Sequence, residues 1–183
     1  AKMLESCGIQ ALTIHGRTRT QKFKGQANWD LIGEAKKAVK IPVIGNGDVV
    51  SPEDVVTMLN VAKVDGVMIG RGSYGNPWIF ERSKHYLKTG ELLPLPSLQE
   101  RVDVLLEHLD LSIQLKGERR GILEMGKHYG NYLHGLRNVK YLKAHLRDLK
   151  SYAEIKSAIE TFIANPHQGP EQAPVAELSA VSL

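Results

Sequence analysis

The sequence has little cysteine, few aromatic residues and no long apolar run, and each shortage excludes a class of protein. Cys7 is the only cysteine among 183 residues, which excludes a framework of internal disulfides and any zinc site built from several cysteines. No apolar run approaches the roughly 20 residues that a membrane span needs, and we expect no signal peptide. The expectation is a protein of the reducing cytoplasm that binds neither a metal nor a membrane.

Charge of one sign is not in large excess either. The chain has 24 Lys and Arg against 20 Asp and Glu, a net charge of +4, and 42% of its residues are hydrophobic. These values exclude a mainly disordered chain and a strongly polycationic nucleic-acid arm. The length suits one domain or two small ones.

Strands and helices alternate in the first 90 residues. The apolar runs are nearly continuous, as in parallel strands that are covered on their faces, so three βα units and an α/β fold are predicted. Asn28 and Ser51 are expected N-caps, with Pro52 at the first helical position. We expect strands at residues 11–14, 41–44 and 66–69, and helices at 1–6, 29–39, from 52 and from 77 to 88.

After Gly90 the pattern changes to helices only. A proline-rich connector at residues 92–97 precedes a long amphipathic stretch. Helices are expected at residues 99–115, 122–133, 139–149 and 152–163. The sequence therefore predicts a helical bundle over residues 91–164, followed by a disordered tail at 165–183.

Glycine recurs at the ends of the second and third strands. Residues 44–47 read IGNG, and residues 69–72, which lie 25 positions later, read IGRG. A missing Cβ lets backbone N–H groups approach an anion, and the loops after the last two strands of a (β/α)8 barrel form its usual phosphate site. One Gly-x-Gly is more often a tight turn, but two copies favour phosphate binding, with Arg71 to neutralise the charge. Asp48 could begin a helix or orient a ligand.

A polar loop follows the first strand. His15 ends that strand, where barrels place catalytic and cofactor-binding groups, and a functional role is as probable as a structural one. Arg17, Arg19, Lys22 and Lys24 come next. Such a run is usually a solvated face, although at the mouth of a barrel it could meet a polyanion.

Three strings of residues together resemble the tRNA-dihydrouridine synthases, particularly their bacterial B-type branch. These are HGRTRTQKFKGQANW from His15, IPVIGNGD from Ile41 and GVMIGRGSYGNPWIF from Gly66, and the resemblance covers about residues 1–164. It implies a flavin mononucleotide (FMN)-containing TIM (β/α)8 barrel with a helical tRNA-binding domain. In this family NADPH reduces the flavin, which then reduces the C5=C6 bond of a uridine in tRNA.

The resemblance also implies roles for single residues. The three strands, within residues 1–90, would be the sixth, seventh and eighth of the barrel. His15 would lie near the flavin, and Arg17 and Arg19 would lie toward the RNA. The FMN phosphate region would be held by Asn46, Gly47, Asp48, Gly70 and Arg71.

The helical part fits an RNA partner on its charge. Residues 118–150 contain eight Lys or Arg and three Asp or Glu, a net charge of +5. Lys140, Lys143 and Arg147 recur at helical spacing, with Lys150 beyond them, and such a face can follow phosphates. Base stacking could come from Tyr129, Tyr132 and Tyr141.

One element of the family is absent from this sequence. The family's catalytic acid is a cysteine in an Asn-x-Gly-Cys-Pro string, whereas Cys7 lies at a helix end before the first strand. We therefore expect the C-terminal portion of a dihydrouridine synthase, with no catalytic residue of its own, inactive alone and self-associating through open barrel edges. Two alternatives stay open: another FMN- or phosphate-binding barrel, such as a dihydroorotate dehydrogenase-like enzyme, and a noncatalytic RNA-binding fragment.

Overall fold

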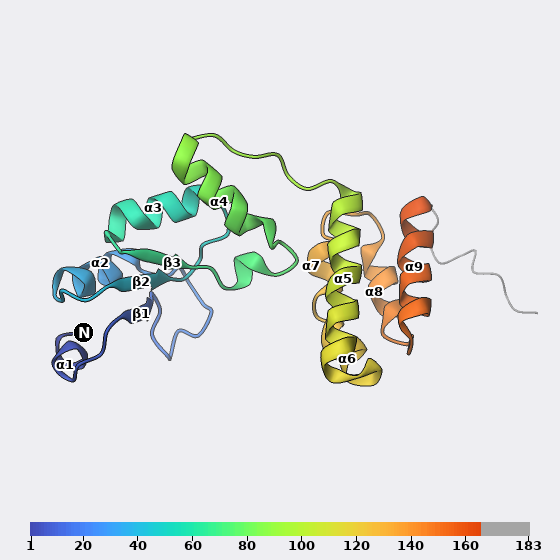
Figure 1. The fold of residues 1–183 in the computed structure, drawn as a ribbon, viewed down its shortest axis with the longest axis horizontal. Coiled ribbons are helices and arrows are strands. Elements are labelled where there is room, and N and C mark those ends of the chain that lie inside the picture. The colour runs from blue at the N-terminus through green and yellow to red at the C-terminus, as the bar shows by residue number, and fades with distance from the viewer. Residues whose placement is uncertain (166–183) are drawn as a thin grey trace, which may run out of the picture. The chain divides into compact units, whose positions relative to one another are not determined.

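A computed structural model describes residues 1–165 of the chain (Figure 1). The chain divides into two compact units, Ala1–Pro96 and the residues from Ser97 onward. Apart from Asn165, the tail predicted at residues 165–183 lies outside the described residues.

The first unit is built around a parallel sheet of three strands in the order β1-β2-β3. A helix lies between each strand and the next, as predicted for consecutive βα units. Its elements are α1 (Lys2–Ser6), β1 (Leu12–His15), α2 (Trp29–Lys37), β2 (Val43–Asn46), α3 (Pro52–Ala62), β3 (Gly66–Met68), the 3-10 turn η1 (Arg71–Ser73) and α4 (Trp78–Thr89).

Side-chain caps fix where the helices of this unit begin. The Asn28 side chain accepts a hydrogen bond of 3.0 Å from the Leu31 N–H, and Ser51 forms a reciprocal capping box with Asp54 in front of Pro52. At the other end of α4, Gly90 adopts a left-handed conformation with φ +74°. The predicted caps at Asn28 and Ser51 are confirmed.

Helices α2 and α3 cover one face of the sheet. Val43 is fully buried among Ile32 of α2 and Met58 of α3, and Leu12 and Val67 pack against the same cluster. Side chains alternate along a strand, so the opposite face carries the intervening residues. That face is exposed or half-buried in the described residues, and it holds Thr13, His15, Ile44, Asn46 and Met68.

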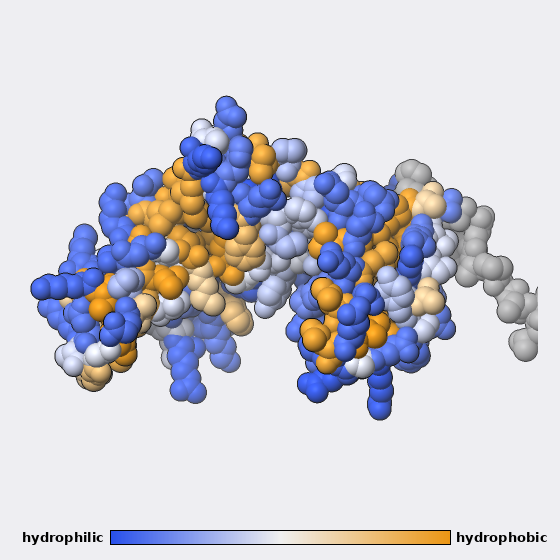
Figure 2. Space-filling view, viewed as in Figure 1, coloured by the Kyte–Doolittle hydropathy of each residue, from blue (hydrophilic) through white to orange (hydrophobic). Residues whose placement is uncertain are grey.

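The second unit consists of helices: α5 (Leu98–Lys116), α6 (Glu118–Met125), α7 (Tyr129–Tyr132), α8 (Val139–Leu146) and α9 (Tyr152–Ala164). Gly121 allows α6 to lie against α5, since a Cβ there would come within 2.7 Å of the Ile113 Cα. Leucine side chains stay exposed around the α5–α6 turn, where hydrophobic residues show on the surface (Figure 2). Within residues 1–165 no helix is long and apolar enough to cross a membrane.

Two helix predictions in this unit are wrong in detail. The helix expected at residues 122–133 is broken by a turn at residues 126–128, and glycines 126 and 130 explain why continuing it gains little. The helix expected at 139–149 ends at Leu146. Both the Lys150 and Ser151 N–H groups donate to the Glu154 carboxylate at 3.0 Å, so the preceding residues form the turn into α9.

Candidate functional site

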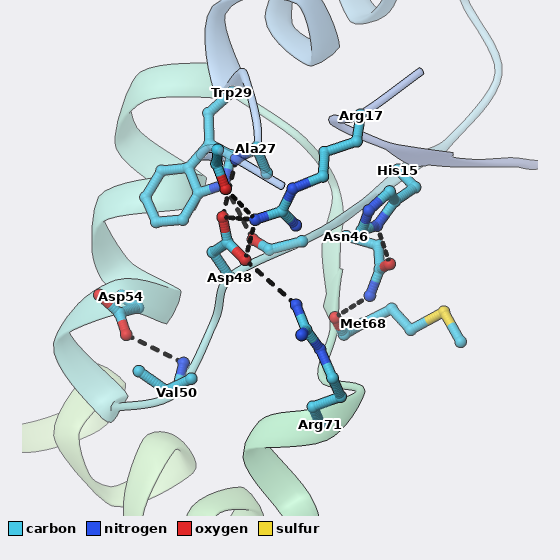
Figure 3. A network of polar contacts seen from close by, with 12 residues as sticks. His15, Arg17, Ala27, Trp29, Asn46, Asp48, Val50, Asp54, Met68 and Arg71 are labelled. Carbon is cyan, nitrogen blue, oxygen red and sulfur yellow. Dashed lines mark hydrogen bonds and ion pairs between the residues drawn. The ribbon is translucent and has the colours of Figure 1, made fainter. Parts of the chain in front are cut away.

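The carboxyl ends of the three strands bring His15, Asn46 and Met68 into one row across the sheet. His15 pairs with Asn46 in the register of β1 and β2, and Asn46 pairs with Met68 in that of β2 and β3. The Asn46 Nδ2 donates to the Met68 carbonyl at 2.7 Å, so its Oδ1 is the acceptor for His15 Nδ1 at 2.6 Å (Figure 3). This hydrogen bond fixes the imidazole ring with its proton on Nδ1.

Next to this row, Arg17, Asp48 and Arg71 point toward one another (Figure 3). The Arg17 Nη2 lies 2.7 and 2.6 Å from the two carboxylate oxygens of Asp48, and the Ala27 N–H donates to the same carboxylate at 2.7 Å. The Arg71 Nη2 lies 3.6 Å from Asp48 Oδ1. Three segments that are distant in sequence therefore meet at one carboxylate.

The charge state of Asp48 follows from these contacts. Burial acts to raise the pKa of the carboxyl, but the hydrogen bonds from Arg17 and Ala27 and the charges of both arginines outweigh it and hold the pKa below its ordinary value. Asp48 is therefore ionised at neutral pH. Because Ser51 caps α3, Asp48 does not begin that helix, and its carboxylate instead contacts Arg17 and the Ala27 N–H of the loop.

Arg17 is not where an RNA-contacting side chain would lie. Its side chain is only 3% exposed, and its Nη2 also donates to the Gly25 carbonyl at 2.7 Å. Its Nε and Nη1 are buried without a hydrogen-bond partner among residues 1–165. In the described structure this arginine is thus enclosed by the protein, whereas Arg19 is exposed. The spacing of residues in the sequence did not indicate that Arg17 would pair with Asp48, 31 residues away.

Further contacts close and anchor the loop of residues 16–27. The Asn28 N–H donates to the Gly16 carbonyl at 2.7 Å, which joins the two ends of the loop. The indole Nε1 of Trp29 donates to the Gly47 carbonyl at 2.9 Å. Sequence reasoning missed both Gly25 and Trp29, because their contacts depend on backbone carbonyls that no side-chain pattern reveals.

The glycines near this site differ in how much space surrounds the position that a Cβ atom would take. A Cβ at Gly47 would lie 2.6 Å from the Ala27 Cβ, and one at Gly72 would lie 2.3 Å from the Val49 carbonyl oxygen, so neighbouring parts of the protein occupy that space. A Cβ at Gly70 would meet no atom within 4 Å. Of these three, only Gly70 therefore leaves open space of the kind that an approaching ligand needs.

Arg71 follows Gly70 and offers an accessible positive charge. Its side chain is 54% exposed, and its guanidinium carbon lies 4.7 Å from the centre of the Phe23 ring. The Ser73 N–H and Oγ both donate to the Gly70 carbonyl, at 3.0 and 2.8 Å, which fixes the start of η1. The exposed cation of Arg71 therefore lies next in the chain to Gly70, whose backbone has open space beside it.

In the helical unit, the predicted RNA-contacting cations Lys140 and Lys143 lie on α8, and Arg147 is the residue that follows its end. Lys140 and Arg147 are exposed, and Lys143 is half-buried with its stem over Gly130, whose Cβ would come within 2.9 Å of the Lys143 Cε. The prediction of base stacking by Tyr129 and Tyr132 is wrong, because these residues are 2% and 5% exposed. Burial raises the pKa of Tyr129 to about 12. Tyr141 remains exposed.

Cys7 lies away from the candidate site. It is an exposed, unpaired cysteine at the end of α1, on the amino-terminal side of β1, whereas the site lies at the carboxyl ends of the strands. Among residues 1–165, no three His, Cys, Asp or Glu side chains are grouped as metal ligands would be. The site as described is built from arginines, a carboxylate, an imidazole and backbone.

Comparison with known proteins identifies relatives along nearly the whole chain. A "probable tRNA-dihydrouridine synthase" of Rickettsia bellii is 41% identical over 162 residues, which are 88% of this chain and 50% of the relative. The "tRNA-dihydrouridine synthase B" of Pseudomonas putida is 42% identical over 171 residues, 93% of this chain and 51% of the relative. That of Shewanella oneidensis is 42% identical over 162 residues, with 88% and 50% covered.

The chain spans about half the length of these curated relatives. A family model described as dihydrouridine synthase matches residues 1–166. This match sets aside the dihydroorotate dehydrogenase-like alternative. The chain belongs to the dihydrouridine synthase family.

Proposed function

We propose that this chain carries the FMN-phosphate edge and an RNA-contacting face of a tRNA-dihydrouridine synthase. The observation that carries the proposal is the cluster at the carboxyl ends of the strands, where the exposed Arg71 follows the open backbone of Gly70. The names of the relatives, tRNA-dihydrouridine synthase and tRNA-dihydrouridine synthase B, support tRNA as the substrate.

The residues at this edge fit a phosphate monoester. Gly70 has space where a side chain would be, and no side chain caps the η1 turn that follows it. Asp48 would repel a phosphate by itself, but its charge is balanced by Arg17 and its carboxylate is occupied. Arg71 is then available to pair with the phosphate, while Asp48 holds the Arg71 side chain in place.

When bound, FMN would supply the hydride that reduces the uridine C5=C6 bond, with NADPH as its reductant. His15 would hold the flavin by a hydrogen bond through Nε2, because Asn46 already engages Nδ1. Asn46 acts on the ligand through His15 and the backbone, since both ends of its amide are paired within the sheet.

We further propose that β1, β2 and β3 are the sixth to eighth strands of a TIM barrel. Residues 1–90 would then belong to the flavin-binding domain and residues 91–164 to the tRNA-binding domain. Both β1 and β3 are edge strands in the described sheet, and they would pair with further strands or with a second copy. Because Cys7 lies at the wrong end of β1 for the candidate site, this chain alone should not reduce uridine.

Titration of the purified chain with FMN and with an unmodified tRNA transcript tests the proposal. We expect quenching of flavin fluorescence on binding, and tRNA affinity that falls steeply with salt because cations on the protein replace counterions on the phosphates. RNA binding without any FMN binding would favour the noncatalytic RNA-binding fragment. Failure to bind either ligand would contradict the proposal.

A further inference from the structure

The loop between β1 and α2 presents a phenylalanine to solvent. Phe23 is 70% exposed, more than any other aromatic residue among residues 1–165. It stands between Lys22 and Lys24, and all three are exposed. Covering an aromatic ring is favourable, so a ring at the tip of a loop rich in Lys and Arg is available to a partner that offers an apolar face and negative charge.

The loop that carries this ring is held in one shape. The Thr18 N–H and Oγ1 both donate to the Gln21 Oε1, at 2.8 and 3.0 Å, and the Lys24 N–H donates to the Gln21 carbonyl at 2.9 Å. Lys22 has a left-handed backbone with φ +52°, which turns the chain at the tip. Below the tip, Arg17 ties the loop to Gly25 and Asp48. The tip is therefore organised before any partner arrives.

The charged residues of the loop that carries the ring are all cationic. Residues 16–27 contain four Lys or Arg and no acidic residue. Asp48 neutralises Arg17, but the other three cations, Arg19, Lys22 and Lys24, are exposed. The Arg71 guanidinium lies 4.7 Å from the Phe23 ring centre, and most of the ring surface nevertheless remains in solvent.

An unpaired stretch of RNA matches this combination. Its bases offer open faces that stack on aromatic rings, and its phosphates pair with flanking cations. A duplex hides the faces of its bases, and an acidic peptide would engage the lysines without needing the ring. The exposed ring and the local charge together favour single-stranded RNA over both.

We propose that the loop tip, residues 19–24, binds unpaired RNA, with Phe23 stacking on a base and Arg19, Lys22 and Lys24 contacting the neighbouring phosphates. The choice of RNA as the ligand rests on the proposed function. The proposal deepens it by adding an RNA contact in the α/β unit that is separate from the basic face of α8, and by specifying how that contact is made.

Binding of the full chain to two labelled RNAs tests this proposal. One is a 12-nucleotide single strand with a central 2-aminopurine, whose fluorescence reports stacking, and the other is a duplex of the same strand. Phe23→Ala and Phe23→Leu should each weaken binding to the single strand by about fivefold or more, the lower limit for loss of one base–aromatic stack. Phe23→Trp should retain the affinity and the 2-aminopurine signal. The affinity losses of Phe23→Ala and Phe23→Leu should be much smaller on the duplex.

Two further variants separate charge from stacking. Lys22→Gln combined with Lys24→Gln should reduce the slope of log affinity against log salt by about 1.4, whereas Phe23→Ala should leave that slope unchanged. Phe80→Leu is the matched control, because Phe80 is an exposed aromatic residue on α4, outside the loop, and should bind like wild type. Thermal unfolding of each variant confirms that the fold is intact.

Unchanged single-strand binding by Phe23→Ala and Phe23→Leu would overturn the proposal, and so would equal losses on the single strand and the duplex. If wild type binds unmodified tRNA while the Phe23 variants show no loss, only the loop-tip surface is wrong. If wild type binds neither tRNA nor the single strand, this proposal fails together with the RNA part of the proposed function.

Discussion

The two units of this protein arrange their charged residues in opposite ways. In the α/β unit, Arg17 and Arg71 come from distant segments, and a nitrogen of each lies within 3.6 Å of the Asp48 carboxylate. In the helical unit, Lys140 on α8 and Arg147 just after its end are both exposed. The first arrangement depends on contact geometry, so one substitution should disturb it strongly. The second depends on summed charge, so substitutions there should have small, additive and salt-dependent effects.

Replacement of Asp48 should have the largest effect. Asp48→Asn keeps the shape of the side chain but leaves the Arg17 guanidinium buried without a countercharge, which should lower the free energy of unfolding by about 3 kcal/mol. Urea-induced unfolding measures the change. Glu34→Gln is the control, because Glu34 is an exposed acid on α2, and it should change stability by less than about 0.5 kcal/mol. Equal stability of the two variants would show that the ion pair does not organise this unit.

Two neighbouring glycines should respond differently to the same added methyl group. Gly72→Ala places a Cβ against the Val49 carbonyl oxygen and should cost about 1–3 kcal/mol of stability. Gly70→Ala adds its Cβ to open space and should leave stability nearly unchanged while weakening FMN binding. Thermal unfolding together with FMN titration separates the two effects. Loss of stability in Gly70→Ala without weaker FMN binding would contradict the assignment.

Removal of charge from α8 and from Arg147, which follows its end, should act on RNA binding alone. The triple variant Lys140→Gln, Lys143→Gln, Arg147→Gln should lower the slope of log tRNA affinity against log salt by about 2 to 3, with little change in stability. Lys156→Gln serves as control, since Lys156 lies on α9 beside Glu160. Salt titrations by fluorescence anisotropy give the slopes. An unchanged slope in the triple variant would exclude α8 as a tRNA-binding face.

Mild acid should weaken the helical unit and leave the Asp48 cluster intact. The ring centroids of His108 and His128 lie 4.9 Å apart with the rings tilted, and burial lowers both pKa values, with smaller contributions from Lys116 and Lys127 and, for His128, from His108. Below about pH 6.5 the unfolded chain then binds more protons than the folded chain. The free energy of unfolding therefore decreases as the pH is lowered. The lowered pKa of Asp48 has the same sign but acts at lower pH, since its contribution to stability is lost only as the pH falls below the usual range of an aspartate.

Unfolding followed by circular dichroism at pH 7.5 and 5.5 tests this difference. Wild type should lose stability at pH 5.5, and His108→Asn combined with His128→Asn should lose less between the two pH values. The same pH dependence of stability in both proteins would mean that protonation of these two histidines does not destabilise the helical unit.

The sequence was most informative where one residue controls a local structure. Asn28 and Ser51 determine where α2 and α3 begin, because each satisfies backbone N–H groups within one turn of itself. It was least informative between Gly126 and Leu149. There, weak helix formers and a competing cap at Ser151 decide where helices stop, so the apolar spacing alone predicts helices that are too long.

The candidate site was predictable as a place but not as a set of contacts. The glycines after β2 and β3 and the position of His15 pointed to the end of the sheet where Arg17, Asp48 and Arg71 meet. The burial of Arg17 against Asp48 was not visible, since a long-range ion pair leaves no periodic signal. The exposed Phe23 and the buried Tyr129 were equally hidden, because exposure of an aromatic residue is decided by tertiary packing.

The edge formed by Gly70 and Arg71 is proposed to recognise the phosphate of FMN. Comparing FMN with riboflavin, which lacks the phosphate, tests it most directly, with each flavin titrated against wild type and Arg71→Ala. Wild type should bind FMN at least about tenfold more tightly than riboflavin, the value of one charge-assisted phosphate contact, and Arg71→Ala should lose most of that preference. Equal affinity of wild type for the two flavins, or a preference for FMN that survives in Arg71→Ala, would contradict the account.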